Sequence, residues 1–478
     1  MTNASTAKMT LDWVPFTPKD VTLGHDVSLL DLFWLIKQEH ETCYLLESIS
    51  HPRHQDRFHV LGFSPALLLS ARGDTLTVTG KPEIMERCFG TATDKLEITG
   101  INPYEYLSDN LDMNRGGRSH EGGLIGLFCH EAMNYFEPSM KLAEHPVFEP
   151  FRLGLYLDGL ILDTVTQSLS YYSYDEDRSD MVRALLARLP LENSGGPVET
   201  RYLGCSETEE SFTKKVADTQ KKICEGYSFQ AEVGMKSYFE VKGDKFTAYK
   251  HLREVNPSPY MYYLQFGDQE LFGASPEILI SCKSGRILTT PTAGTIRRGV
   301  DDAEDVKLAR QLLSDPKEIA EHNMLVDLHR NDISMVCQPG TVVVEDLMYL
   351  IKFSHVQHIV SNVVGVKARD KTGFDVLRCI LPGGVVTGAP KIETVKIIDH
   401  NEGQPRGPYG GAVGRFGFNG DCDFCLPIRS LFCDGDQCFA QTSAGVVYDS
   451  RPAHEYQEVQ RKLDGMRKTL AKFEGQGK

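Results

Sequence analysis

The sequence predicts an α+β fold, in which groups of strands lie beside separate helices. Short apolar runs bounded by turn residues are typical of strands, and several follow one another before the first helical segment that we expect. Further on, strands and helices mix without a regular one-by-one alternation. This order favours an α+β arrangement over a doubly wound parallel sheet.

Strands dominate the region before about residue 190. We expect strands in CYLLESIS, ALLLSA and LGLYLDGLILDTV, and a helix in MVRALLARL. A polar stretch, LENSGGPVETRYLGCSETEE, follows at about residues 190–210 and contains Gly, Pro and Ser. We interpret it as a soft boundary between region 1–200 and region 201–478, which we expect to be intertwined in one sandwich.

Helices become more frequent after this boundary. Acceptor residues in SETEESF open one helix, and SDPKEIAEHNMLVDLHR forms another that begins at Asp315. The expected strands between them are MYYLQF, LFGASPEILISC and RILTTPTAG. CLPIRSLFC and CFAQTSAGVVYD flank Asp434-Gly435 and predict a long hairpin. A last helix is expected from about Pro452 to Phe473.

Composition excludes several classes of protein. The 478 residues are 41% hydrophobic and 24% charged, which is ordinary for a globular chain. A net charge of −15 argues against electrostatic binding of nucleic acid or of an anionic membrane surface. We find no apolar run that would span a membrane and expect no secretory signal. Twelve Cys are too few for a disulfide scaffold, so we expect a cytoplasmic protein that acts on a small molecule.

Two of the predicted helices each carry a pair of carboxylates. Glu318 and Glu321 are three residues apart, as are Glu455 and Glu458, so each pair shares one helix face. Four converging carboxylates would suit a hard divalent cation such as Mg2+. Each helix alone has a simpler explanation, because Glu318 can take part in a helix cap and Glu458 can pair with Lys462.

Glycine-rich turns and cysteines are further candidates for a site. The turns PTAGT, PGGVVTGAPK, RGPYGGAVGRFGFNG and TSAG would let backbone N–H groups approach an anion, although tight hairpins are the simpler explanation. The spacing C-x2-C-x7-C-x4-C suggests zinc, but its short centre favours separate thiols. These cysteines are Cys422, Cys425, Cys433 and Cys438.

Six short segments carry a family resemblance. They are GASPE (273–277), AEHNMLVDLHRND (320–332), SHVQHIVS (354–361), TGAPK (387–391), RGPYGGAVGRFGFNGD (406–421) and EYQEVQRK (455–462). In these segments, and in their order, the chain resembles the chorismate-utilising enzymes, most closely anthranilate synthase component I. The resemblance implies that family's fold, with large antiparallel sheets packed as a sandwich and helices outside. It also implies a lyase of tryptophan biosynthesis that converts chorismate and ammonia to anthranilate and pyruvate.

The resemblance also implies a separate source of ammonia. The sequence contains no Gly-x-Cys-x-Gly elbow for a glutaminase nucleophile, so a glutamine amidotransferase subunit, anthranilate synthase component II, is the expected partner in a hetero-oligomer. Gln230 stands where hydroxylating relatives carry a Lys base that activates water, and an amine nucleophile needs no such base. Ala293 stands where many aminodeoxychorismate synthases carry a nucleophilic Lys.

Position by position, the resemblance assigns roles in the expected site. Mg2+ would be held by Glu321 and Glu458, with Glu318 and Glu455 near it through water. Glu277 would protonate the departing 4-hydroxyl. The other catalytic residues would be His358, which assists aromatisation, Gln230 and Lys462. Chorismate would be bound by Gly294, Thr295, Tyr409, Arg429, Ser443, Ala444 and Gly445.

The segments LLES and NPSPYM resemble the tryptophan-feedback pocket of the same family. This implies inhibition by L-tryptophan, bound by Glu47, Ser48, Pro259, Tyr260, Met261 and Cys425. A plain buried strand is the alternative for LLES. The part of the pocket before residue 200 then belongs to the N-terminal region, and the chorismate-binding residues to region 201–478.

Departures from the family pattern leave three alternatives open. Val385 replaces an expected hydroxyl residue, which could stop the reaction at 2-amino-2-deoxyisochorismate. Gly383 and Thr387 resemble aminodeoxychorismate synthases. A non-catalytic subunit that senses tryptophan would bind tryptophan without turnover, although the intact carboxylates argue against it.

Overall fold

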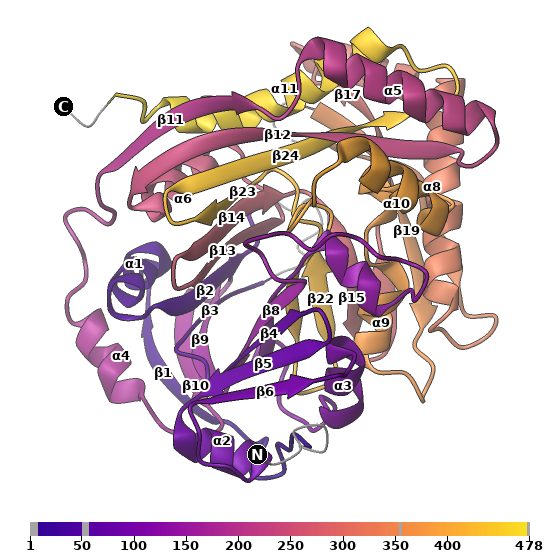
Figure 1. Cartoon of the computed structure of the whole chain (residues 1–478). Coiled ribbons are helices and arrows are strands. Elements are labelled where there is room, and N and C mark those ends of the chain that lie inside the picture. Colours follow the sequence, from indigo (N-terminus) through magenta and orange to yellow (C-terminus); the bar gives the residue numbers. More distant parts are fainter. Residues whose placement is uncertain (1–7, 50–56, 353–355, 476–478) are drawn as a thin grey trace.

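The computed structural model describes residues 8–49, 57–352 and 356–475. Two twelve-stranded sheets form its centre (Figure 1), and neighbouring strands within both sheets pair antiparallel. Helices lie outside these sheets. The predicted α+β sandwich is therefore confirmed.

The first sheet combines strands from widely separated parts of the chain. Across the sheet their order is β1 (Lys19–His25), β10 (Ser168–Ser173), β9 (Asp158–Asp163), β3 (Phe58–Phe63), β2 (Thr42–Glu47), β13 (Tyr260–Phe266), β14 (Gln269–Ser275), β23 (Ser430–Asp434), β24 (Gln437–Val446), β12 (Gln230–Gly243) and β11 (Val198–Cys205), and β20 (Gly388–Ala389) pairs with β12. The pairing of β2 with β13 joins strands from both sides of residue 200.

The second sheet is built in the same way. Its order is β17 (Thr292–Arg297), β19 (Val356–Val366), β16 (Arg286–Thr289), β15 (Ile278–Lys283), β22 (Cys422–Cys425), β21 (Ala412–Phe416), β7 (Gly123–Phe128), β8 (Phe151–Tyr156), β4 (Leu67–Arg72), β5 (Thr75–Gly80) and β6 (Lys95–Thr99), and β18 (Val343–Lys352) pairs with β19. Here β7 pairs with β21, so this sheet also joins strands from both sides of residue 200.

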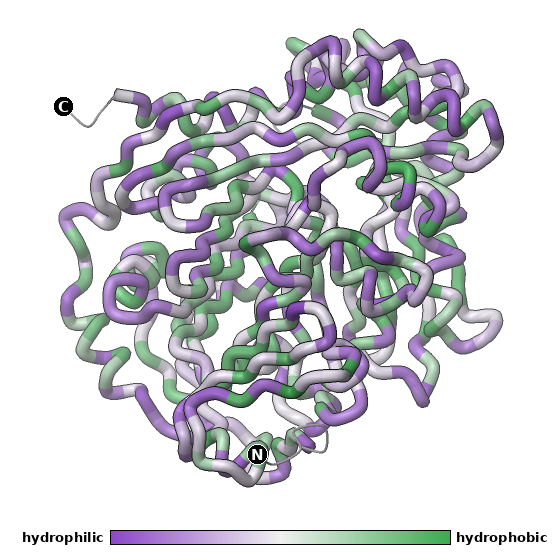
Figure 2. The backbone as a smooth tube through the Cα atoms, in the orientation of Figure 1, coloured by the Kyte–Doolittle hydropathy of each residue, from purple (hydrophilic) through white to green (hydrophobic). Residues whose placement is uncertain are grey.

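The main core fills the space between the sheets. Side chains alternate along a strand, so Tyr44 and Leu264 point into this core while their neighbours Leu45 and Tyr263 join a second cluster on the outer face of the first sheet. Hydrophobic stretches accordingly follow many of the central strands in Figure 2. Both faces of the first sheet are thus buried.

Helices cover the second cluster and the ends of both sheets. α1 (Leu29–Glu39), α4 (Ser179–Leu186) and α6 (Lys245–Val255) contribute to the second cluster, while α5 (Glu209–Cys224) and α11 (Pro452–Ala471) pack against β12 and β24. The remaining helices are α2 (Pro82–Phe89), α3 (Pro103–Asn110), α7 (Asp302–Leu312), α8 (Pro316–Ser334), α9 (Gly373–Ile380) and α10 (Lys391–Glu402), with short 3-10 helices at His130–Tyr135 and Gly384–Val386. No helix within the described ranges is long and apolar enough to cross a membrane.

The hairpin predicted around Asp434-Gly435 is present but shorter than expected. β23 and β24 form it, and Gly435 has a φ of 53° in the turn. Cys425 was expected in its first arm, but it ends β22 in the other sheet. The chain crosses between the sheets at residues 426–429, where Pro427 has no N–H for a strand ladder and Arg429 has a positive φ of 52°.

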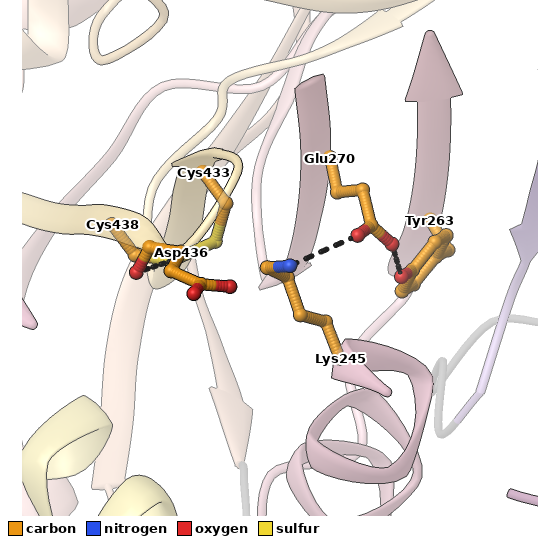
Figure 3. The surroundings of a disulfide bond; sticks show 6 residues. All are labelled: Lys245, Tyr263, Glu270, Cys433, Asp436 and Cys438. Carbon is orange, nitrogen blue, oxygen red and sulfur yellow. Dashed lines mark hydrogen bonds and ion pairs between the residues drawn. A yellow bond between two sulfur atoms is a disulfide. The ribbon is translucent and has the colours of Figure 1, made fainter. Parts of the chain in front are cut away.

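The four cysteines do not gather into one site. Cys433 and Cys438 lie opposite each other in the hairpin and form a disulfide, near the ion pair of Lys245 and Glu270 (Figure 3). Cys422 and Cys425 are buried in the second sheet. The expectation that all four are separate thiols is therefore wrong for the disulfide pair.

Candidate active site

Two pairs of carboxylates approach each other from separate helices. Asp315 caps α8 by accepting the N–H of Glu318, and the same helix carries Glu321. Burial raises the pKa of both glutamates, and the charge of Glu458 on α11 contributes to both shifts. Burial also raises the pKa of Glu455, again with a contribution from Glu458. The four carboxylates are therefore close enough to repel one another.

These carboxylates have the chemistry of a site for a hard cation. Oxygen ligands suit Mg2+, and a bound cation would offset the repulsion that the charge of Glu458 adds to the effect of burial on the other three. However, the described residues contain no group of three or more His, Cys, Asp or Glu side chains arranged to hold a metal ion. The four carboxylates therefore do not all meet at one point. Glu321 and Glu458 remain the two residues that we predict to bind the ion directly.

A fifth carboxylate, Glu232 on β12, lies beside them. Burial raises its pKa to about 7; Lys462 opposes this shift, whereas Glu321 and Glu458 add to it. The Ser443 hydroxyl donates a hydrogen bond to Glu232 and lies 2.8 Å from the Tyr409 hydroxyl. Sequence analysis did not identify Glu232, although it stands two residues from Gln230 on a strand and so shares its face.

Lys462 connects Ser443 on β24 to Glu458 on α11. Its ammonium donates to the Ser443 carbonyl oxygen at 2.8 Å and pairs with Glu458 at 2.8 Å. Although burial opposes the charge, Glu458 and Glu232 raise the pKa of Lys462 to about 12. The predicted helix ion pair is therefore present, and the same ammonium also reaches β24.

The side chain of Gln230 on β12 reaches over Gly445 of the neighbouring strand β24. Gln230 Nε2 donates to Glu321 Oε1 at 3.0 Å. Glu232 pairs with Gly445 across β12 and β24. A Cβ at Gly445 would lie 2.5 Å from Gln230 Nε2, so any larger residue there would displace the amide of Gln230. Ala444 is fully buried with its side chain in the apolar cluster beneath α11, and it can offer the site only its backbone.

Glu277 and Arg429 lie close to each other, and Glu277 is also near Glu232. Glu277 is 5% exposed, and burial raises its pKa to about 8 against the opposing charge of Arg429. Burial lowers the pKa of Arg429, while Glu277 opposes that shift. Among the described residues no carboxylate forms an ion pair with Arg429 within 4.0 Å. Arg429 is therefore available to a bound anion.

His358, Thr295 and Gly294 complete the arrangement on β19 and β17. The His358 Nδ1 lies 2.9 Å from the Thr295 hydroxyl. Burial lowers the pKa of His358 to about 3, and Arg429 adds to this shift. Gly294 has a φ of 77° where the pairing of β17 and β19 shifts register, and a Cβ there would lie 3.1 Å from Glu318. The predicted catalytic, substrate and metal residues thus lie in one connected region.

The residues predicted to bind tryptophan line a separate cavity of about 60 Å³. All six are present in its wall: Glu47, Ser48, Pro259, Tyr260, Met261 and Cys425. Sequence analysis missed the other wall residues, among them Arg415 and His120, whose side chains lie 3.2 Å apart.

Known proteins resemble this chain in sequence and in fold. The family described as chorismate binding enzyme matches residues 87–468. Anthranilate synthase component 1 of Leptospira biflexa is 40% identical over 95% of this chain and 96% of its own length. Aminodeoxychorismate synthase component 1 of Bacillus subtilis is 36% identical over 93% of this chain and 94% of its own. The crystal structure of anthranilate synthase component I from Streptococcus pneumoniae matches with a TM-score of 0.73, at 28% identity, over 93% of this chain and 98% of its own.

Proposed function

The chain belongs to the chorismate binding enzymes, and on this premise we propose that it is the component I of an anthranilate synthase. It converts chorismate and ammonia to anthranilate and pyruvate in tryptophan biosynthesis. The observation that carries the proposal is the enclosed Glu277 carboxyl beside Arg429 and near Glu232, which in turn lies near the two acidic helices. That arrangement supplies a proton donor and an anion-binding group at once. The likeness to curated anthranilate synthases over nearly the whole chain supports the choice within the family.

Arg429 and Lys462 are the cations that would receive the two carboxylates of chorismate. A guanidinium can bind a carboxylate through two parallel N–H bonds, and Arg429 has no carboxylate partner within the described part of the chain. Tyr409 and Ser443 add hydroxyl groups on the adjoining wall. Mg2+ held by Glu321 and Glu458 would supply positive charge for the ring carboxylate.

Glu277 is suited to donate a proton because its pKa of about 8 keeps it protonated at neutral pH. When the lone pair of ammonia forms a bond to carbon 2, the two conjugated ring double bonds both shift, to carbons 1 and 6 and to carbons 4 and 5, and the bond from carbon 4 to its hydroxyl breaks. Glu277 gives that oxygen a proton, so water leaves, and the new ammonium group releases one proton in turn. His358, neutral at this pH, then accepts the ring proton at carbon 2 while the bond from carbon 3 to the enolpyruvyl oxygen breaks. The enolate that leaves takes up a proton and becomes pyruvate.

A partner glutaminase subunit is proposed as the source of ammonia, and the functional unit is then a hetero-oligomer in the cytoplasm. This rests on the match to component I proteins.

Aminodeoxychorismate synthesis is the second candidate. The Bacillus subtilis relative and the residues Gly383 and Thr387 favour it, whereas Ala293 in place of a nucleophilic Lys opposes it.

The separate cavity is proposed to bind L-tryptophan as a feedback inhibitor. Arg415 is 5% exposed, and within the described residues no carboxylate pairs with it. Burial and the charge of Arg415 lower the pKa of His120 to about 2, so the His120 side chain beside Arg415 is neutral. Arg415 is thus free to bind the carboxylate of tryptophan, although a cavity of about 60 Å³ admits the indole only if wall side chains move.

Product identity tests the proposal. The purified chain is incubated with chorismate, Mg2+ and ammonium at alkaline pH, and the product is analysed by fluorescence and chromatography. Fluorescent anthranilate with one equivalent of pyruvate is expected. A non-fluorescent amino product without pyruvate would assign 2-amino-2-deoxyisochorismate synthesis, and a 4-amino product would assign the second candidate. Tryptophan binding without turnover would assign a sensing subunit.

A further inference from the structure

Two acceptor groups meet on one face of β12, above a glycine of the neighbouring strand. Gln230 and Glu232 are two residues apart, so their side chains point to the same side of the sheet. Glu232 lies opposite Gly445 on β24. A Cβ at Gly445 would be 2.5 Å from Gln230 Nε2 and 2.8 Å from Glu232 Oε1, so both side chains reach over the same glycine.

One of these acceptors is buried and has no donor. Gln230 is 3% exposed and uses its Nε2 to donate to Glu321. Its Oε1 has no hydrogen-bond partner among the residues that the structure describes. A buried amide oxygen without a donor is destabilising, which indicates that an N–H or O–H group from a ligand belongs there.

The second acceptor is a carboxyl group, which bears a negative charge above its pKa of about 7. Glu232 accepts from the Ser443 hydroxyl through Oε2, while its Oε1 lies over Gly445. Its carboxyl also lies close enough to Glu277 to raise the pKa of that proton donor. Glu232 is therefore close both to the amide of Gln230 and to the group that protonates the leaving hydroxyl.

We propose that the Gln230 carbonyl oxygen and the Glu232 carboxylate form the subsite for the ammonia nucleophile. This inference rests on the proposed function and names the group that holds its second substrate. Ammonia offers three N–H donors and one lone pair; two acceptors on one strand hold two N–H groups and leave the lone pair for chorismate. An amide oxygen and a carboxylate are both acceptors, whereas a Lys at position 230 would offer donors in the same place.

The carboxylate also distinguishes ammonia from water after the bond has formed. Nitrogen bears a positive charge once its lone pair is shared with carbon, until one proton leaves. A carboxylate beside that nitrogen stabilises the charged adduct through a charge-assisted hydrogen bond. The neutral amide of Gln230 can orient the nitrogen but cannot supply that charge.

The test measures steady-state kinetics with ammonium chloride as the nitrogen source, at saturating chorismate and Mg2+. Glu232→Gln keeps the shape of the side chain and removes its charge, and we expect the KM for ammonium to rise about tenfold or more. Gln230→Met removes the acceptor at similar length and is expected to act in the same direction. The KM for chorismate and the apparent activation constant for Mg2+ should change less than about twofold in Glu232→Gln, well below that tenfold effect.

Glu240→Gln is the matched control. Glu240 lies on the same strand and in the same alternation as Glu232, but it pairs with Arg201 at 3.1 Å near the surface. It should leave all three constants unchanged, because an exposed ion pair contributes little. Thermal unfolding of each variant checks folding, and if Glu232→Gln unfolds, Gln230→Met decides the question.

The kinetic constants of the variants distinguish failure of the subsite from failure of the proposed function. If the wild type and Glu240→Gln turn over but Glu232→Gln or a folded Gln230→Met keeps the wild-type KM for ammonium, the subsite is wrong. It is also wrong if the constants for chorismate or Mg2+ rise as much as that for ammonium. If the wild type and the control both fail to aminate chorismate, the proposed function has failed, and the subsite fails with it.

Discussion

The substitution Glu277→Gln is expected to lower the catalytic rate and, at alkaline pH, to raise the stability of the fold. The change keeps the shape of the side chain but removes the only group to which we assign protonation of the leaving hydroxyl. General acid catalysis contributes about 10²- to 10⁴-fold, so kcat should fall by about that factor. Anthranilate fluorescence at saturating chorismate, Mg2+ and ammonium measures the loss.

The same change should stabilise the fold at alkaline pH. Burial raises the pKa of Glu277 from its usual 4.5 to about 8, and a difference of this size corresponds to roughly 5 kcal/mol as an upper value. Between these two pKa values the folded state holds a proton that the unfolded state has lost, so wild-type stability falls as pH rises through that range. A neutral Gln does not titrate and avoids this loss.

Urea unfolding at several pH values provides the assay. The stability of Glu277→Gln relative to wild type should grow from about pH 5 to about pH 8 and stay constant above that, in line with linkage. The exposed Glu199→Gln serves as a control, with no growing difference expected. A stability difference that is independent of pH would refute the assigned burial of an ionisable Glu277, and full activity in Glu277→Gln would refute its role as proton donor.

Three further variants test other parts of the site. Arg429→Lys loses the two-pronged contact with a carboxylate, so the KM for chorismate should rise about tenfold to a hundredfold; an unchanged KM would place the substrate elsewhere. Glu321→Gln should raise the Mg2+ concentration needed for half-maximal activity about tenfold or more, and full activity at the wild-type Mg2+ concentration would exclude Glu321 as a ligand. Arg415→Gln should weaken tryptophan inhibition about tenfold with kcat unchanged; equal inhibition would show that Arg415 does not bind the effector.

Local signals predicted the helices of the site better than its strands. Asp315 accepts backbone N–H bonds at the start of α8, as its position before Pro316 and Glu318 predicts. The hairpin arm at Cys425 was misplaced because neighbouring apolar residues look alike in either sheet. The crossing depends on the backbone of Arg429, and a positive φ at a non-glycine residue has no clear signature in a single sequence.

Glu232 shows a different limit of sequence analysis. Side chains alternate along a strand, so the sequence was enough to predict that Glu232 points to the same face as Gln230. What the sequence does not contain is the pairing of β12 with β24, which brings Ser443 and Gly445 to that face from two hundred residues away. Long-range pairing of this kind decides which of many glutamates lies in the site. The family resemblance supplied this information only for positions that match its motifs.

The charges of the site explain why a cation and a protonated acid belong to the same mechanism. Six carboxyl groups lie within this region, on Glu232, Glu277, Glu318, Glu321, Glu455 and Glu458, whereas Lys462 and Arg429 are the cations assigned to the substrate. A substrate with two carboxylates would add further negative charge to an enclosed volume, where like charges repel strongly. Neutral Glu277 removes one of the six charges, and a divalent cation between α8 and α11 would offset two more. Chorismate affinity should therefore depend on the same two features that its chemistry requires, the proton on Glu277 and the cation at Glu321 and Glu458.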